Sequence, residues 1–275
     1  MIARLTGNHF YFIIALVTMK RKKKKTKWWL IPVIIFFVLS LYITGMYLWQ
    51  QHEEEKAKFA MYPGFGIQLP VGYQLHGIDV SFYQEFVYWP SVKKMDEQDV
   101  KIGFVFIKAT EGLSNTDKQF KRNWLLTKQA GITRGAYHFF IATKDGTQQA
   151  KNFIKNVKLQ PGDLPPVLDI EQLYGVSPQL MRQRITDWLR VTEAAYHVKP
   201  IIYSNADFYN RNLGNAFNKY PLWVAHYFEN NQPRVSRNWT FWQHNSGGKV
   251  NGITSLVDFN VFNGDTTAFN NLLIK

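Results

Sequence analysis

Two acidic residues, Asp169 and Glu171, are the side chains in this 275-residue sequence whose types and spacing most directly indicate chemistry. They end the stretch 165–171 (PPVLDIE), which is typical of a short buried strand. Because side chains alternate along a strand, the two carboxylates share one face, with backbones about 6.5–7 Å apart. A raised carboxyl pKa beside an ionised partner is what glycosidic bond cleavage requires. A strand end with two solvated acids gives the same short pattern, so the pair alone leaves both interpretations open.

The elements that would position this pair alternate between strand and helix from residue 75 onward. Continuous apolar runs such as 102–107 are typical of parallel strands covered on both faces. The fold class predicted is therefore α/β: an irregular single-domain (β/α)8 TIM-like barrel whose last units are degraded, preceded by one N-terminal transmembrane helix. The expected strands are 75–80, 102–107, 135–140, 166–171, 200–204, 222–227, 240–244 and 252–259, and the expected helices are 86–100, 117–130, 145–157, 177–196 and 206–213.

Such a barrel places its catalytic groups at the C-terminal ends of its strands. Asp79 ends the first expected strand, Glu111 follows the second, and Asp258 ends the eighth. Several acids at one barrel mouth favour a functional site over a chance pair. The other polar or aromatic side chains expected late in strands are Tyr137, His138, Tyr203, Trp223, Tyr227, Trp242 and Gln243.

The N-terminal part of the chain indicates a membrane anchor. Residues 28–49 hold 22 residues without a charge, which as a helix would span about 33 Å. Seven Lys and Arg lie just before it at 20–27, so the N-terminus is expected to stay cytoplasmic and residues 50–275 to be exported, facing a periplasm or a cell wall. A retained signal anchor is favoured over a cleaved peptide because no small-x-small cleavage site follows.

Four segments are expected along the chain: a basic cytoplasmic N-terminus at 1–27, a transmembrane signal anchor at 28–49, a linker at 50–72 and a barrel domain at 73–275. Met19 directly precedes the basic cluster, so it is a candidate for the true start, with 1–18 a mis-assigned extension.

Composition excludes several classes of site. The sequence has no cysteine, which excludes disulfides, zinc-thiolate sites and a cysteine nucleophile. The net charge of +13 comes largely from the N-terminus: from residue 61 onward 23 Lys and Arg face 17 Asp and Glu. No basic stripe interleaved with aromatic residues is present, so no nucleic-acid partner is predicted. The histidines at 76, 138, 226 and 244 lack ligand spacing, so no metal and no cofactor are predicted, and His138 is expected to be a core residue.

An ordered set of short motifs resembles glycoside hydrolase family 25, the Chalaropsis-type lysozymes. The set covers residues 75–262, nearly the whole expected barrel. The motifs are 76–81 (HGIDVS) with Gln84, 106–112 (FIKATEG), 134–139 (RGAYHF), 166–171 (PVLDIE), 202–205 (IYSN), 222–227 (LWVAHY), 241–244 (FWQH) and 252–262 (GITSLVDFNVF).

The resemblance implies a muramidase that cuts the β-1,4 bond between N-acetylmuramic acid and N-acetylglucosamine in peptidoglycan glycan strands. By position, Glu171 would be the general acid, and Asp169 would stabilise charge or orient the 2-acetamido group of the substrate. Asp79 and Asp258 would position and tune this pair, while Glu111 would serve the rim. The sugar-binding walls would be Tyr137, Tyr203, Trp223, Tyr227, Trp242 and Gln243.

Three questions stay open at this point. Asp169 could act as a nucleophile, or the N-acetyl carbonyl could attack C1 with Asp169 holding the amide, and the i, i+2 spacing favours the second. The substrate could be another N-acetylglucosamine polymer such as chitin, or the protein could be an inactive, membrane-tethered wall-binding protein. Tyr88 stands where the family often has an acid before Trp89, which leaves a local contact in doubt. The catalytic domain is expected to be monomeric.

Overall fold

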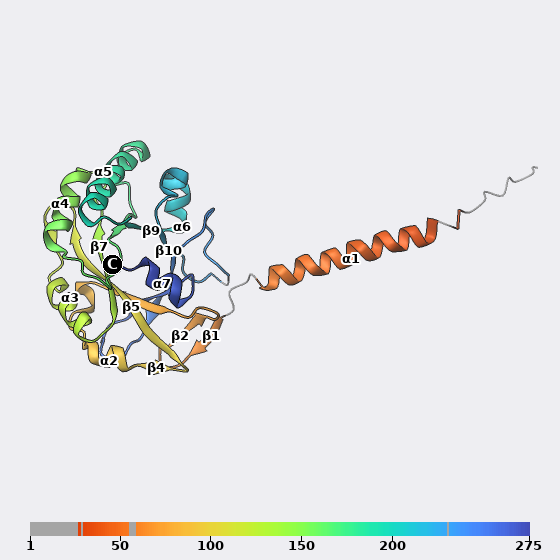
Figure 1. Cartoon of the computed structure of the whole chain (residues 1–275), viewed down its shortest axis with the longest axis horizontal. Coiled ribbons are helices and arrows are strands. Elements are labelled where there is room, and N and C mark those ends of the chain that lie inside the picture. The colour runs from red at the N-terminus through yellow and green to blue at the C-terminus, as the bar shows by residue number, and fades with distance from the viewer. Residues whose placement is uncertain (1–26, 29, 55–58, 230) are drawn as a thin grey trace, which may run out of the picture. The chain divides into compact units, whose positions relative to one another are not determined.

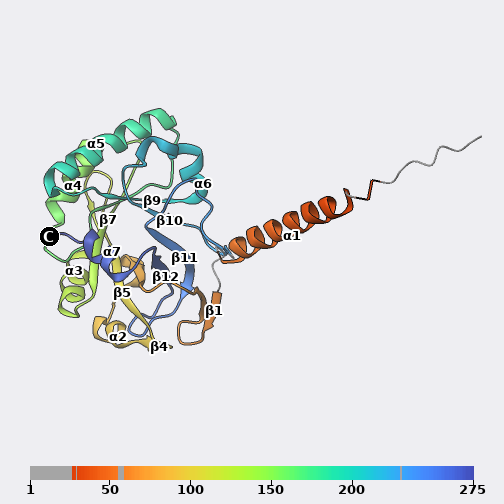
Figure 2. The same ribbon diagram turned by 45° about the vertical axis from the view of Figure 1, so that its right-hand side comes forward.

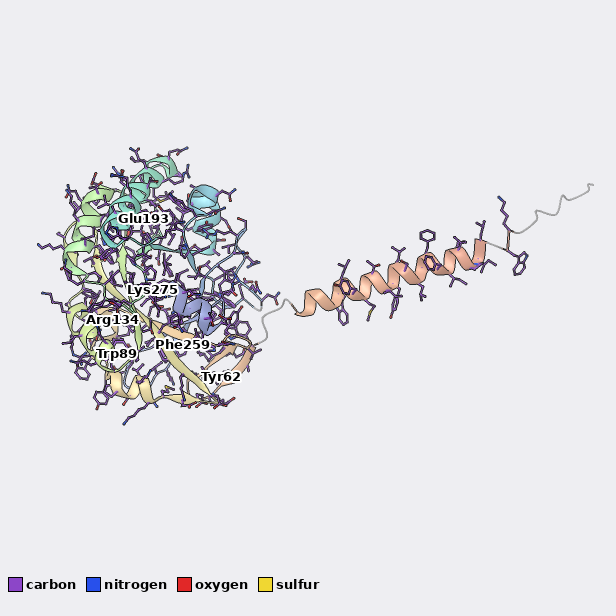
Figure 3. The ribbon with its side chains drawn as sticks, in the orientation of Figure 1. Tyr62, Trp89, Arg134, Glu193, Phe259 and Lys275 are labelled. Carbon is purple, nitrogen blue, oxygen red and sulfur yellow. The ribbon has the colours of Figure 1, made fainter. Side chains whose placement is uncertain are left out.

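The computed structural model describes residues 27–28, 30–54, 59–229 and 231–275. The chain forms two compact units that divide between Glu53 and Glu54. The first contains all but the last residue of helix α1 (Leu30–Glu54), whose apolar part, Leu30–Trp49, is 20 residues long and has its side chains exposed on all sides (Figure 3). The predicted span 28–49 thus contains a helix long and apolar enough to cross a membrane. The predictions for the basic cluster and for Met19 fall outside the described residues, Lys27 excepted.

Among the described residues of the second unit, eight strands close into a barrel (Figure 1). Seven of them run parallel to one another, and the circle closes because the first strand pairs with both the second and the last. The predicted eight-stranded barrel is therefore confirmed. The strands are β3 (His76–Val80), β5 (Val100–Glu111), β7 (Thr133–Phe139), β8 (Val167–Asp169), β9 (Ile201–Asn205), β10 (Leu222–Ala225), β11 (Phe241–Gly248) and β12 (Val257–Phe262).

Helices follow the first five of these strands and pack outside the barrel. Figures 1 and 2 both show α3, α4 and α5 along one side of it. Two predicted helix starts are confirmed, because the side chains of Asp145 and Ser177 accept hydrogen bonds from the backbone N–H groups of Gln148 and Leu180. The helices are α2 (Trp89–Lys94), α3 (Phe120–Gln129), α4 (Gly146–Asn156), α5 (Pro178–Tyr196) and α6 (Ala206–Phe208), which continues into the short turns η2 (Tyr209–Leu213) and η3 (Gly214–Phe217).

The end of the barrel differs from a (β/α)8 pattern. Strand β12 is antiparallel to both of its neighbours, β11 and β3. Only eight residues, 249–256, connect β11 to β12, and a parallel return needs a crossover of about a dozen or more residues. The predicted last strand 252–259 is also misplaced: Gly252 lies in a turn with φ of +94°, and the strand is Val257–Phe262.

The predicted helix 86–100 is much shorter than expected. Helix α2 ends at Lys94, and a tight hairpin follows in which β4 (Asp96–Glu97) pairs with the start of β5. The turn residues Gln98 and Asp99 both have positive φ, which a helix does not allow. The second half of the predicted helix is therefore a hairpin, with its turn at Gln98 and Asp99.

The predicted linker 50–72 contains a folded hairpin, made of β1 (Phe59–Tyr62) and β2 (Ile67–Pro70). Its side chains Phe65 and Leu69 are fully buried, and the Phe65 ring packs 5.1 Å from that of Phe259 on β12. The hairpin covers outer barrel strands that have no helix, so the folded unit begins well before residue 73.

At the N-terminal ends of the parallel strands, aromatic side chains plug the barrel. Helix α7 (Thr266–Leu272; Figure 2), which the sequence reasoning missed, brings Phe269 to within 5.7 Å of Phe104 and 5.1 Å of Phe262, ring centre to ring centre. Above this plug Phe106 stacks on Trp223 at 4.2 Å. The interior is thus a packed core with one open end, and many of the chain's aromatic side chains belong to that core.

A buried ion pair ties β7 to the loop that leads to β8. The Arg134 guanidinium donates to both carboxylate oxygens of Asp163, at 2.8 and 3.2 Å, and also covers the Trp124 ring at 3.8 Å (Figure 3 labels Arg134). Both charged side chains are almost fully buried. Removing one partner would leave the other charge buried and unpaired.

We therefore expect Asp163→Ala to lower the free energy of unfolding by about 3–5 kcal/mol, measured by urea denaturation monitored by tryptophan fluorescence. The matched control is Asp187→Ala, which breaks the exposed pair with Arg190 at 3.6 Å and should cost less than about 1 kcal/mol. Equal losses in the two variants would contradict the structural role given to the buried pair.

Candidate functional site

A cavity of about 260 Å³, called here the acid pocket, opens at the C-terminal ends of the parallel strands. Four carboxylates line it, and they come from three separate places in the barrel: Asp79 on β3, Asp169 and Glu171 at the end of β8, and Asp258 on β12. The structure thus brings together the four acids that the sequence singled out. The remaining predicted residues that line the acid pocket are Tyr137, Tyr203, Trp223, Tyr227 and Gln243.

Asp169 and Glu171 face the same pocket, as the alternation rule predicted, although the strand is shorter than expected. Strand β8 ends at Asp169, and the backbone N–H of Ile170 donates to the carbonyl of Tyr203 on the next strand at 3.0 Å. Ile170 is fully buried in the core, which turns its two acidic neighbours the other way. Local pairing with β9 therefore sets the direction of both carboxylates.

Burial dominates the electrostatics of this pair. Desolvation raises the pKa of Asp169 well above its usual range, and the nearby Glu171 carboxylate raises it further. Desolvation also raises the pKa of Glu171, while the Tyr203 hydroxyl and Lys108 oppose that rise. Asp169 Oδ1 is buried and has no hydrogen-bond partner among the described residues, so it is available to a ligand.

Asp79 and Asp258 lie opposite each other in the register of β3 and β12. Asp79 Oδ2 accepts hydrogen bonds from Gln243 Nε2 and Asn260 Nδ2, both at 2.8 Å, while burial and the Asp258 carboxylate raise the pKa of Asp79. Burial raises the pKa of Asp258 to about 6. Asp258 does not end its strand as predicted: it is at the start of an antiparallel strand, which is why it still reaches the mouth.

A hydrogen-bonded network connects the tyrosines to these acids. Gln243 Oε1 accepts from the hydroxyls of Tyr203 at 2.8 Å and Tyr227 at 2.6 Å, while its amide nitrogen donates to Asp79. Asn260 adds a further link, because its Oδ1 accepts from Trp223 Nε1 at 2.7 Å. Sequence reasoning missed Asn260, although its i, i+2 spacing from Asp258 on one strand places both on the same face.

Two of the predicted site residues, Trp242 and Glu111, do not line the acid pocket. Trp242 is fully buried, does not line the acid pocket, and packs against Trp239 and Phe59 outside the barrel. Because Gln243 faces the barrel interior, the alternation along β11 sends Trp242 to the outer face, so its assignment to the sugar-binding wall was wrong. Glu111 lies beside the acid pocket and does not line it, which fits its predicted place at the rim.

Lys108 is a second functional candidate, after Asn260, that the sequence reasoning overlooked. It is the one basic side chain among the described residues that line the acid pocket, and its Nζ donates to Glu111 Oε2 at 2.7 Å. Its positive charge opposes the rise in pKa of both Asp169 and Glu171. The sequence feature that could have indicated Lys108 is its position, three residues before Glu111 at the end of the second barrel strand.

His138 is held in the core by polar neighbours on both of its ring nitrogens. His138 is fully buried, with Nδ1 2.7 Å from Thr110 Oγ1 and Nε2 3.3 Å from Gln149 Oε1, and desolvation lowers its pKa to about 3. The expectation that His138 is a core residue is therefore confirmed. Within the described ranges, no group of three or more His, Asp or Glu side chains is arranged to hold a metal ion.

Comparison with known proteins gives a consistent result. Residues 78–253 match the family described as Glycosyl hydrolases family 25. The chain is 46% identical over 200 residues to an uncharacterised Escherichia coli K12 protein, YegX, covering 73% of this chain and 74% of that one. It is 38% identical to lysozyme M1 of Streptomyces globisporus, covering 69% and 68% of the two chains.

A solved structure agrees with the sequence comparisons. A family 25 glycosyl hydrolase from Bacillus anthracis superposes with a TM-score of 0.68 at 31% identity, covering 74% of this chain and 95% of that one. The match to the family spans more than half of the sequence, and the fold of the second unit is that of the solved relative. The chain therefore belongs to glycosyl hydrolases family 25.

Proposed function

We propose that this protein is a peptidoglycan hydrolase of the muramidase type, which cleaves the β-1,4 bond between N-acetylmuramic acid and N-acetylglucosamine. The observation that carries the proposal is the acid pocket: a buried carboxylate, Asp169, and a half-buried one, Glu171, both with raised pKa values, at the mouth of a family 25 barrel. The relatives named lysozyme M1, autolytic lysozyme and N,O-diacetylmuramidase support the same activity.

In this proposal Glu171 is the general acid. It is the more accessible member of the pair, and burial holds its carboxyl group protonated to higher pH than usual, as an acid near neutral pH requires. Asp169, with its unpartnered oxygen, stabilises positive charge at the sugar or orients the 2-acetamido group. Asp79 and Asp258 position substrate and tune the central pair, and the sugar-binding walls are Tyr137, Tyr203, Trp223, Tyr227 and Gln243.

Product analysis tests the bond assignment. The full-length protein, kept in detergent, would be incubated with purified peptidoglycan, and the released fragments would be reduced with borohydride and identified by mass spectrometry. Fragments reduced at muramic acid are the expected result. Fragments reduced at glucosamine, or cleavage of chitin in preference to peptidoglycan, would replace the muramidase with another glycosidase. Binding to the wall without any release would favour the inactive wall-binding protein.

Lys108 provides a prediction on pH dependence. Its cation stabilises the ionised forms of Asp169 and Glu171, so Lys108→Met should raise the pKa of both groups. The mechanism needs one ionised and one protonated carboxyl group in this interacting pair, so the two apparent pKa values of the pair set the acidic and the basic side of the profile. The whole bell-shaped plot of kcat against pH should therefore move to higher pH by about one unit.

The control for this shift is Lys101→Met. Lys101 lies at the other end of the same strand, pairs with Asp96 at 3.1 Å and is exposed. Its replacement should leave the profile in place. An unmoved profile in Lys108→Met, measured at constant ionic strength, would show that Lys108 does not set the ionisation of the acid pair.

We further propose that α1 is a retained signal anchor, with a cytoplasmic basic N-terminus at 1–27 and an exported, monomeric hydrolase. The apolar length of Leu30–Trp49 supports an anchor, and a signal peptide with the same helix is the competing form. We place the start of the catalytic domain at Phe59, because the hairpin packs on the barrel. Mass spectrometry of the protein extracted from membranes distinguishes the two forms, since a cleaved signal peptide would remove residues 30–49.

A further inference from the structure

A second cavity lies directly beside the acid pocket and is called here the side pocket. It has a volume of about 460 Å³ and shares Tyr83 and Lys108 with the acid pocket, so the two cavities adjoin at these side chains. One wall comes from the short 3-10 helix η1 (Phe82–Gln84), and the other comes from the end of β5 and the segment that follows it. Nothing in the proposed cleavage chemistry uses this cavity.

The walls of the side pocket are fixed by hydrogen bonds. Asp117 Oδ2 accepts from the backbone N–H of Phe82, and Asp117 Oδ1 accepts from that of Gln119, both at 2.8 Å. The Phe82 and Tyr83 rings lie 4.1 Å apart, and Tyr83 remains 71% exposed between the two cavities. Both carboxylate oxygens of Asp117 accept hydrogen bonds from backbone N–H groups. This residue therefore fixes the position of η1, and these bonds already compensate its charge.

The charges of the side pocket leave one cation without an acidic partner. Glu111 is paired with Lys108 at 2.7 Å, and Asp117 is occupied as described. Lys118 Nζ lies 5.1 Å from the centre of the Phe82 ring, and within the described part of the chain no carboxylate is within ion-pair distance of it. The side pocket therefore presents an exposed ammonium group next to a site lined by acids.

We propose that the side pocket binds the peptide attached to muramic acid, with Lys118 binding one of that peptide's free carboxylates. The inference rests on the proposed muramidase function, because the sugar whose bond is cut carries this peptide on its lactyl group, directly beside the acid pocket. In strands that carry the peptide, the glycan backbone is uncharged because each lactyl carboxyl group is in amide linkage, so it offers no partner for the ammonium group of Lys118. The carboxylates of the peptide do.

The test compares three substrates: soluble glycan strands with their peptides, the same strands after an amidase has removed the peptides and the lactyl carboxylates that it exposes have been amidated, and strands whose peptide carboxylates have been amidated. Full-length wild type, Lys118→Ala and Lys118→Arg would be assayed on each. For Lys118→Ala we expect the ratio of kcat/KM on peptide-bearing strands to kcat/KM on stripped strands to fall about tenfold, mainly through KM. Lys118→Arg should restore most of the ratio, and 0.5 M salt should reduce the wild-type ratio.

The possible results of this comparison distinguish the roles that Lys118 could have. A matched control, Lys121→Ala on the outer part of α3, should keep the wild-type ratio, since Lys121 is exposed and does not line the side pocket. An equal loss on peptide-bearing and stripped strands would assign Lys118 to a sugar-binding or structural role and overturn the proposal. An equal loss on native and amidated peptides would overturn the carboxylate contact. If wild type cuts none of the three substrates, it is the muramidase function itself that fails.

Discussion

Replacing Glu171 with glutamine is expected to lower kcat on peptidoglycan by about a thousandfold, because an amide cannot donate the proton that the leaving oxygen needs. The substitution keeps the size of the side chain at the end of β8, where the neighbouring Ile170 is anchored in the core. The fold and the binding of glycan should therefore survive. The rate would be measured as release of new reducing ends, and binding would be measured by co-sedimentation with purified cell walls.

Glu193→Gln is the matched control for this experiment. Glu193 is on α5 (Figure 3), where its carboxylate accepts from the Tyr220 hydroxyl at 3.1 Å, and it does not line the acid pocket. It should retain wild-type turnover. If Glu171→Gln kept more than about a tenth of wild-type activity while still binding walls, the general acid would have to be another residue, and Asp258 with its pKa raised to about 6 would be the next candidate.

The pH dependence of Glu171 has a definite sign. A general acid works only while protonated, so activity is lost as pH rises through its pKa. Burial raises that pKa, which extends activity toward neutral pH, and the Tyr203 hydroxyl and Lys108 limit the rise. The Lys108→Met shift and the Glu171→Gln loss thus address the same proton by independent means.

The sequence predicted the parallel part of the barrel well because that part depends on local, repeated signals. Continuous apolar runs such as 102–107 specified buried strands, and Ser177 with Pro178 specified the start of α5. The ends of the barrel depend on contacts between distant segments. The antiparallel direction of β12 follows from a short connection and from pairing with β3, and a single-strand pattern does not encode either.

The candidate site shows the same division between local and distant information. Alternation along a strand placed Asp169 and Glu171 on one face, and the same rule could have excluded Trp242 once Gln243 was assigned to the interior. The importance of Lys108 and Asn260 could not be read in that way. Each matters through partners on other strands, Glu111 and the acids for Lys108 and Asp79 for Asn260, and these meet only in the closed barrel.

The cost of holding unpaired acids in the barrel mouth should be measurable as lost stability. A carboxyl group whose pKa is higher in the folded than in the unfolded protein favours folding only while protonated. Its penalty therefore grows as pH rises from the unfolded pKa, about 3.9 for Asp, toward the folded value. Asp169 is buried, has an unpartnered oxygen and has a strongly raised pKa, so it should contribute a large part of this penalty.

Asp169→Asn is accordingly expected to have two opposite effects. Turnover should fall by about a hundredfold or more, because the charge that stabilises the developing cation or holds the acetamido group is removed. The melting temperature at pH 7 should rise, since the amide carries no ionisation penalty, and the gain should shrink toward pH 4, close to the unfolded pKa, where that penalty is small. Differential scanning calorimetry at the two pH values measures the second effect, and a lower melting temperature at pH 7 would contradict the assignment of Asp169 as a destabilising functional acid.

Asp169→Ala then separates the two mechanisms. If Asp169 were a nucleophile, azide entering the vacated space should restore turnover and yield a glycosyl azide of inverted configuration. If Asp169 holds the acetamido group while the N-acetyl carbonyl attacks C1, azide should not restore turnover, and substrates lacking the N-acetyl carbonyl should not be cut even by wild type. The separation of the two acids by a single residue favours the second outcome. The nucleophile would be established instead if a glycosyl azide appeared together with rescued rates.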